Sequence, residues 1–153
     1  MNALQKIFQL FCRTNNDFKA DLVLSCGNAC RVAHYLHKYK LRKFSSPIDW
    51  MMSYSLEAVN NMFEEDFAYF FKDYEQMYEH NNMRVVKDKR NNMVAMHDFV
   101  MQKSIEEQYP HFIEQKTKRF KRLKKELLKA RSVIFLCNRS ENLQNFKDFL
   151  IRM

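Results

Sequence analysis

Two cysteines, Cys26 and Cys30, flank the only glycine of this chain, Gly27. The apolar run at residues 21–25 predicts a strand, and residues 29–39 carry apolar side chains at helical spacing. Together they predict a strand, a turn at the glycine and an amphipathic helix with Cys30 in its first turn. Unpaired N–H groups and the positive end of the helix dipole favour a thiolate at such a position. Cys30 is therefore the strongest single candidate for chemistry.

The composition predicts one folded domain. The chain has 153 residues, of which 46% are hydrophobic and 14% aromatic, enough for a sizeable core. We expect a single domain over residues 1–153, with an N-terminal helix and connector in residues 1–20 and an α/β core in residues 21–153. A further strand would be natural after the last amphipathic segment, so we also expect that a C-terminal element is missing.

The cysteine pattern and the absence of long apolar runs predict a cytoplasmic protein. None of the four cysteines falls in a CxxC pair, which favours reduced thiols over a disulfide framework. Residues 1–16 contain no apolar run long enough for a signal peptide, and no stretch approaches the length of a membrane span. The formal charge of +8 makes polyanions candidate partners.

Hydrophobic periodicity predicts alternating helices and strands. One or two strands are expected at residues 83–86 and 93–96, and a buried strand at 132–137. Residues 102–109 are predicted as loop or a short helix that Pro110 stops. The predicted helices span residues 2–12, 29–39, 55–79 and 111–130, with a last one after Ser140. This order predicts an α/β layered domain with a small, mostly parallel sheet of three to five strands flanked by long helices.

Several short motifs add a more specific expectation. They are SCGNAC at residues 25–30, LRK at 41–43, SPIDW at 46–50 and HDF at 97–99. Together they resemble the bacterial family described as "putative papain-like cysteine peptidases", which is also described as a domain of unknown function. The resemblance extends over nearly the whole chain from Asp21 onward.

The resemblance implies a Cys–His pair, with Cys30 as nucleophile and His97 as general base. A base of this kind needs an acceptor that orients its ring, and Asp98 or Asp49 is the candidate for that role. Asn28, beside the helix start, is the candidate to bind an oxyanion together with the backbone N–H of Cys30. The implied activity is thiolate attack on the acyl carbonyl of a peptide or other acyl substrate, without a cofactor.

Each of these residues also has a structural alternative. Cys30 would be a small side chain packed under the helix, because free cysteines are often buried. His97 would be an ordinary core or surface histidine. Asp49 would brace the loop at residues 45–50, because aspartate readily accepts hydrogen bonds from loop N–H groups.

Two further kinds of site remain as alternatives. Cys26, Cys30, His34 and His37 follow one another at spacings of four, four and three, which suits zinc, but the histidines flank the apolar side of their helix toward solvent. We therefore expect no metal. The second alternative is a non-catalytic interaction domain that binds an anionic partner, either nucleic acid or an acidic protein. Its candidate residues lie on the basic helix and are Lys118, Arg119, Arg122 and Lys125.

Overall fold

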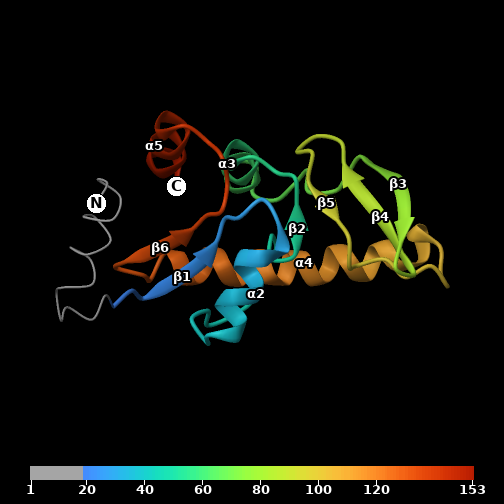
Figure 1. The fold of residues 1–153 in the computed structure, drawn as a ribbon, viewed down its shortest axis with the longest axis horizontal. Helices are drawn as coiled ribbons and strands as arrows, with labels where there is room; N and C mark the ends of the chain where they lie inside the picture. The colour runs from blue at the N-terminus through green and yellow to red at the C-terminus, as the bar shows by residue number, and fades with distance from the viewer. Residues whose placement is uncertain (1–18) are drawn as a thin grey trace, which may run out of the picture.

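The structure is a computed structural model that describes residues 19–153 as four helices and two small sheets (Figure 1). The helix predicted for residues 2–12 lies outside the described residues. The elements are, in chain order, β1 (Leu22–Ser25), α2 (Cys30–Lys38), β2 (Met51–Met52), α3 (Leu56–Glu64), β3 (Tyr74–His80), β4 (Met83–Asp88), β5 (Val94–Ala95), α4 (Ile105–Leu127), β6 (Val133–Leu136) and α5 (Leu143–Arg152).

The first sheet pairs the two ends of the described chain. Strands β1 and β6 run parallel, with Leu22 opposite Val133. Leu22 and Leu24 are buried against Leu123 of α4, which explains the apolar character of β1. The strand, turn and helix predicted around Gly27 are confirmed, because β1 leads through this glycine into α2.

The second sheet is antiparallel, with the strand order β2-β5-β4-β3. The connections from β3 to β4 and from β4 to β5 are too short for a crossover, so these strands must pair in antiparallel fashion. A mixed α/β fold is therefore confirmed, whereas a single, mostly parallel sheet is not. Among the described helices only α4, with 23 residues, is long.

The helix predicted for residues 55–79 is wrong in its second half. Helix α3 starts as expected, with the hydroxyl of Ser55 accepting the N–H of Ala58 at 3.0 Å, but it ends at Glu64. Asp66 and Phe67 then adopt positive φ angles, and residues 74–80 form the exposed edge strand β3. Phe67, Phe70 and Phe71 are buried in the core, whereas Tyr78 of β3 is 50% exposed.

Tertiary contacts explain why the helix does not continue. Phe71 is fully buried at a φ of 52°. Its N–H donates to the buried carboxylate of Asp88 at 3.2 Å, and its carbonyl accepts the hydroxyl of Tyr109 at 3.1 Å. These partners satisfy the backbone groups of Phe71 without a helix. The aromatic side chains can therefore reach the core from a turn, although their spacing is also that of a helix.

Helix α4 runs along the long axis of the molecule and contacts both sheets (Figure 1). It begins with a capping box in which Ser104 and Glu107 exchange hydrogen bonds. The prediction that Pro110 stops a helix is wrong, because α4 continues through it. The capping box and a buried stripe on both sides of the proline offset the one hydrogen bond that it removes.

Helix α5 packs on α3, and Phe149 fills the space between them and β6. Most of the buried side chains form one core that is rich in phenylalanine. Among residues 19–153, no helix is long and apolar enough to cross a membrane.

Candidate functional site

Cys30 is the first residue of α2, and its thiol points at the loop before β2. The sulfhydryl donates to the carbonyl oxygen of Trp50 over 3.4 Å. Ala29 precedes the helix in an extended conformation and offers no side-chain cap. The N–H groups of the first turn therefore have no side-chain partner from the N-cap position.

A side chain in place of Gly27 would crowd the turn. A Cβ atom at this position would lie 2.5 Å from the side-chain oxygen of Asn138 and 2.6 Å from a methyl group of Val32. The turn that leads to Cys30 is thus packed directly against the segment that follows β6.

The pKa of the Cys30 thiol is raised, which differs from the thiolate expected at a helix start. Burial is the largest cause, and the negative charge of Asp98 adds to it. The backbone N–H of Cys30 and the positive charge of Lys116 act in the opposite direction, but they do not prevail. The resting group is therefore a neutral thiol, and a base has to remove its proton before or during an attack.

Sheet pairing brings the loop of Trp50 next to His97. Met51, the residue after Trp50, pairs with Ala95 in the antiparallel β2–β5 ladder. His97 follows Ala95 by two residues, so it lies at the same end of the ladder as the carbonyl that contacts Cys30. Trp50 adopts a φ of 71°, which bulky residues rarely do and which tends to mark functional segments.

One hollow of about 410 Å³ collects these side chains. Trp50 from the β2 loop and His97 from the end of β5 line it together with the inner side of α4. His97 is exposed, so its ring is accessible from solvent. The complete lining is Trp50, His97, Asp98, Gln115, Lys116 and Arg119.

The floor of this hollow is a buried ion pair. The ammonium group of Lys116, only 1% exposed, lies 3.0 Å from a carboxylate oxygen of Asp98. The second carboxylate oxygen of Asp98 is buried and has no hydrogen-bond partner among the described residues. Burial lowers the pKa of Lys116, and the nearby Asp98 opposes that shift. The charges of both residues act on the Cys30 thiol.

Lys116 is the site residue that the sequence patterns missed. It counted as one cation of a basic helix, yet it falls midway between Phe112 and Phe120 at spacings of four. Both phenylalanines are buried, so the position belongs to the apolar stripe of α4. A lysine at a core position of an amphipathic helix was the available signal, because such a lysine needs a buried partner.

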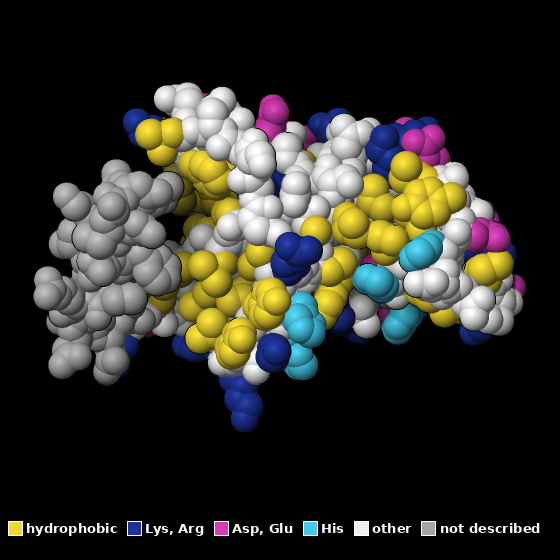
Figure 2. Space-filling view, in the orientation of Figure 1, with side chains coloured by type: hydrophobic (Ala, Val, Ile, Leu, Met, Phe, Trp, Pro, Cys, Tyr) yellow, Lys and Arg dark blue, Asp and Glu magenta, His cyan; other side chains and the backbone are white. Residues whose placement is uncertain are grey.

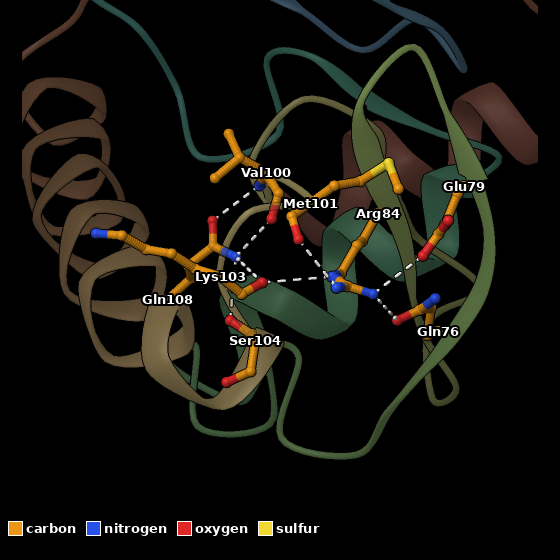
Figure 3. Close-up of polar contacts among 8 residues, drawn as sticks. All are labelled: Gln76, Glu79, Arg84, Val100, Met101, Lys103, Ser104 and Gln108. Atoms are coloured by element: carbon orange, nitrogen blue, oxygen red, sulfur yellow. Dashed lines mark hydrogen bonds and ion pairs between the residues drawn. The ribbon is translucent and has the colours of Figure 1, made fainter.

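A hydrogen-bond network fixes the segment that follows His97 and Asp98 (Figure 3). The side chain of Gln108 on α4 accepts the N–H of Val100 at 2.8 Å and donates to three backbone carbonyls. From the opposite side, Arg84 of β4 donates to the carbonyls of Met101 and Lys103. The loop is thus held between the second sheet and α4, which limits the positions open to the His97 backbone.

Asp49 braces its own loop and does not contact the ring of His97. Its carboxylate accepts the N–H and the hydroxyl of Ser46, at 3.2 and 2.9 Å. Arg42 donates to the same carboxylate at 2.5 Å, and its guanidinium lies 5.9 Å from the Trp50 ring centre. Asp49 is only 3% exposed, so these partners leave it little freedom to orient another side chain.

Asn28, the predicted oxyanion donor, has an exposed side chain two residues before Cys30. Its carbonyl accepts the N–H of Ser53 at 3.0 Å, which ties the turn before α2 to the end of β2. The side-chain amide is therefore accessible from solvent.

The residues of this site lie within a segment that matches a known protein family. The model of the family described as "Putative papain-like cysteine peptidase (DUF1796)" matches residues 21–151. The chain belongs to this family. The match spans all the motifs around Cys30, Asp49 and His97, so the family resemblance expected from them is confirmed. No curated protein and no solved structure matches the chain.

The structure does not bring the four candidate zinc ligands together. His34 and His37 are exposed on α2, whereas Cys26 is buried at the end of β1. In the part of the chain from residue 19 to 153, no group of three or more His, Cys, Asp or Glu side chains could hold a metal ion. Tyr35 on α2 stacks on Tyr39, the residue just after the helix, with 6.0 Å between the ring centres. Figure 2 shows hydrophobic and histidine side chains next to one another in the region of α2.

The four predicted anion-binding residues do not share one surface environment. Lys118 pairs with Glu114 at 2.5 Å, and Arg122 donates to the carbonyl of Ser45 at 3.0 Å. Arg119 lines the hollow beside His97, and Lys125 lines another hollow farther along α4. The basic helix is therefore divided between internal contacts and two separate openings.

Proposed function

We propose that this protein is a cysteine hydrolase or acyltransferase in which Cys30 attacks the acyl carbonyl of a peptide or other acyl substrate. One observation carries the proposal. Trp50, which receives the Cys30 thiol, lines the same hollow as His97 and Asp98, although these residues are far apart in sequence. Membership of a family described as papain-like cysteine peptidases supports the same chemistry.

The first step in the proposed mechanism is proton transfer, because the half-buried Cys30 thiol rests in its neutral form. His97 takes the proton as the sulfur of Cys30 bonds to the acyl carbon and the carbonyl electron pair moves to oxygen. The backbone N–H of Cys30 and the amide of Asn28 are the candidate donors to this oxyanion. Collapse expels the leaving group, which receives the proton from His97.

The second step releases the acyl group. Water, or another nucleophile in a transfer reaction, attacks the thioester and loses its proton to His97. The sulfur leaves as the carbonyl re-forms and regains a proton, which restores the neutral thiol. None of these steps uses a cofactor.

Asp98 and Lys116 form the support for this pair in our proposal. Asp98 adjoins His97 in sequence and has one carboxylate oxygen free, which is available to accept a ring N–H of the histidine. Lys116 compensates the charge of Asp98 and stabilises the negative sulfur as it forms. Asp49, the other candidate for the orienting role, is engaged with Arg42 and Ser46 and has a structural role in this scheme.

We also propose that the enzyme works in a reducing compartment such as the cytoplasm. Cys26, Cys30 and Cys137 are free thiols in the described chain. A half-buried catalytic thiol would be oxidised where disulfides form freely, and the proposed activity would then be lost.

Anion binding by α4 remains a second proposal, favoured by one feature. A hollow of about 540 Å³ beside Phe120 is lined by four lysines and one aspartate, Asp66. The lysines are Lys121, Lys124, Lys125 and Lys129. Nucleic-acid binding that weakens with salt and is lost when Lys121 and Lys125 are replaced by glutamate would support this second proposal. Binding that is unchanged by salt and by these substitutions would contradict it.

An acyl-transfer burst tests the main proposal. With p-nitrophenyl acetate we expect one nitrophenolate per chain in a rapid phase and an acetyl group on Cys30, located by peptide sequencing in a mass spectrometer. Cys30→Ala should abolish the burst, and Cys137→Ala should leave it intact. A burst that survives in Cys30→Ala contradicts the assignment.

A further inference from the structure

Two cysteines that the proposed mechanism does not use face each other across the first sheet. The ladder between β1 and β6 ends with Ser25 opposite Leu136, and the N–H of Cys26 then donates to the carbonyl of Leu136 at 2.9 Å. The next pair in this register is Cys26 and Cys137. Side chains at paired positions of neighbouring strands project from the same face of the sheet, at a backbone separation that a disulfide spans.

A buried arginine lies beside this pair. The side chain of Arg139 is 2% exposed and stacks over the ring of Tyr54, with 5.1 Å between the guanidinium and the ring centre. It donates to the carbonyl of Tyr54, but its Nε has no hydrogen-bond partner among the described residues. Its other ionic contact is with Glu141, at 2.8 Å. A buried cation with a free donor favours a negative group next to it.

The two thiols differ in acidity in the way that a reactive pair requires. The pKa of Cys137 is lowered by its interaction with the neighbouring thiol of Cys26 and by the positive charge of Arg139. The pKa of Cys26 is raised by the same interaction and by burial. Cys137 is half-buried and Cys26 almost fully buried, so a small oxidant reaches Cys137 first.

We propose that Cys137 and Cys26 form an oxidisable dithiol that reacts with hydroperoxides. The thiolate of Cys137 attacks the terminal peroxide oxygen, the O–O bond breaks, and the sulfur becomes a sulfenic acid as the hydroperoxide is reduced to an alcohol or water. The sulfur of Cys26 then attacks Cys137, water leaves with the proton of the Cys26 thiol, and a disulfide joins β1 to β6. Cys137 is thus the peroxide-reactive residue and Cys26 the resolving one.

This dithiol does not rest on the proposed role of Cys30, but it adjoins that residue. The bond would form one residue before Gly27, whose neighbour across the sheet is Asn138. It would therefore tie the turn that leads into α2 to the segment after β6.

Peptide mapping after hydrogen peroxide treatment tests the proposal. We would use the full chain carrying Cys12→Ala and Cys30→Ala, so that Cys26 and Cys137 are the remaining cysteines. One equivalent of hydrogen peroxide should link the tryptic peptides 20–31 and 132–139, and dithiothreitol should separate them. Both peptides recovered unlinked, with both thiols open to alkylation, would overturn the proposal.

Single substitutions separate the two roles. In Cys26→Ser the sulfenic acid at Cys137 should persist and react with dimedone, whereas in Cys137→Ser the thiol of Cys26 should stay reduced at the same peroxide dose. Oxidation of Cys26 without Cys137 would contradict the assigned order. Arg139→Gln should slow the peroxide reaction roughly tenfold, the effect of about one pKa unit, and Arg139→Lys should restore most of the rate. If the Arg139 variants do not fold, the two cysteine variants decide the question.

Discussion

The ammonium group of Lys116 lies 3.0 Å from the carboxylate of Asp98, inside the hollow that His97 and Trp50 also line. For a lysine that is 1% exposed, this carboxylate offsets part of the cost of burying the ammonium group. The pair sits between the apolar core of α4 and the segment that carries His97. It therefore connects the stability of the helix to the electrostatics of the candidate site.

Replacing Lys116 by methionine should destabilise the protein by about 3–5 kcal/mol, because Asp98 would be left partly buried without its cation. The measurement is the free energy of unfolding in urea. Lys118→Met is the matched control, since Lys118 pairs with Glu114 on the exposed side of the same helix, and it should cost less than about 1 kcal/mol. An equal decrease in the free energy of unfolding in the two variants would mean that the buried pair contributes no more to stability than the exposed one. Adding Asp98→Asn to Lys116→Met should recover part of the loss.

Asp49→Asn should lower the free energy of unfolding by roughly 3 kcal/mol, because it removes the charge that neutralises Arg42 in a buried loop. Glu79→Gln is the control, because Glu79 pairs with Arg84 in an exposed position. We further expect the pH profile of Cys30 acetylation to keep its shape in Asp49→Asn. A profile that shifts in Asp49→Asn would assign Asp49 to the orientation of His97 instead.

Gln108→Ala should loosen the loop after Asp98, because it removes the acceptor of the Val100 N–H and the donor to three carbonyls. Hydrogen exchange at Val100 should accelerate roughly tenfold, the effect of losing one hydrogen bond of ordinary strength. Gln102→Ala serves as the control, since Gln102 lies in the same loop with an exposed side chain. Unchanged exchange at Val100 in Gln108→Ala would show that Arg84 alone holds the loop.

The alkylation rate of Cys30 should rise through a pKa above that of an ordinary cysteine, about 8.5. Burial raises the pKa of this thiol, so the reactive thiolate is scarce at neutral pH and forms only as the pH passes the raised value. Iodoacetamide labelling followed by peptide mapping across a pH series measures this. Cys137 is the internal comparison, because its pKa is lowered and its labelling should begin at lower pH. A midpoint for Cys30 below that of Cys137 would contradict the neutral-thiol mechanism.

The local secondary structure around the site could be predicted from the sequence. Apolar periodicity located β1, α2 and β6, and the motifs around Cys30 and His97 identified the family. These features depend on neighbouring residues, which a sequence displays directly.

The predictions that were wrong or incomplete concern features that depend on contacts between residues distant in sequence. The end of α3 is decided by Asp88 and Tyr109, which satisfy the backbone of Phe71 from elsewhere in the chain. The raised pKa of Cys30 comes from burial under other segments, which the helix start alone does not reveal. Lys116 falls on the apolar stripe of its predicted helix, but the carboxylate that pairs with it comes from Asp98 in another segment, which the helix pattern does not reveal.

The most direct test of the account is the single-turnover acetylation of Cys30 by p-nitrophenyl acetate at pH 7, compared between the unaltered protein and His97→Gln. His111→Gln is the control, because His111 is another exposed histidine and lines a second hollow that His97 also borders. We predict that His97→Gln slows acetylation roughly 100-fold, the usual contribution of a general base, while His111→Gln changes it little. Equal acetylation rates in the unaltered protein and His97→Gln would contradict the Cys30–His97 pair.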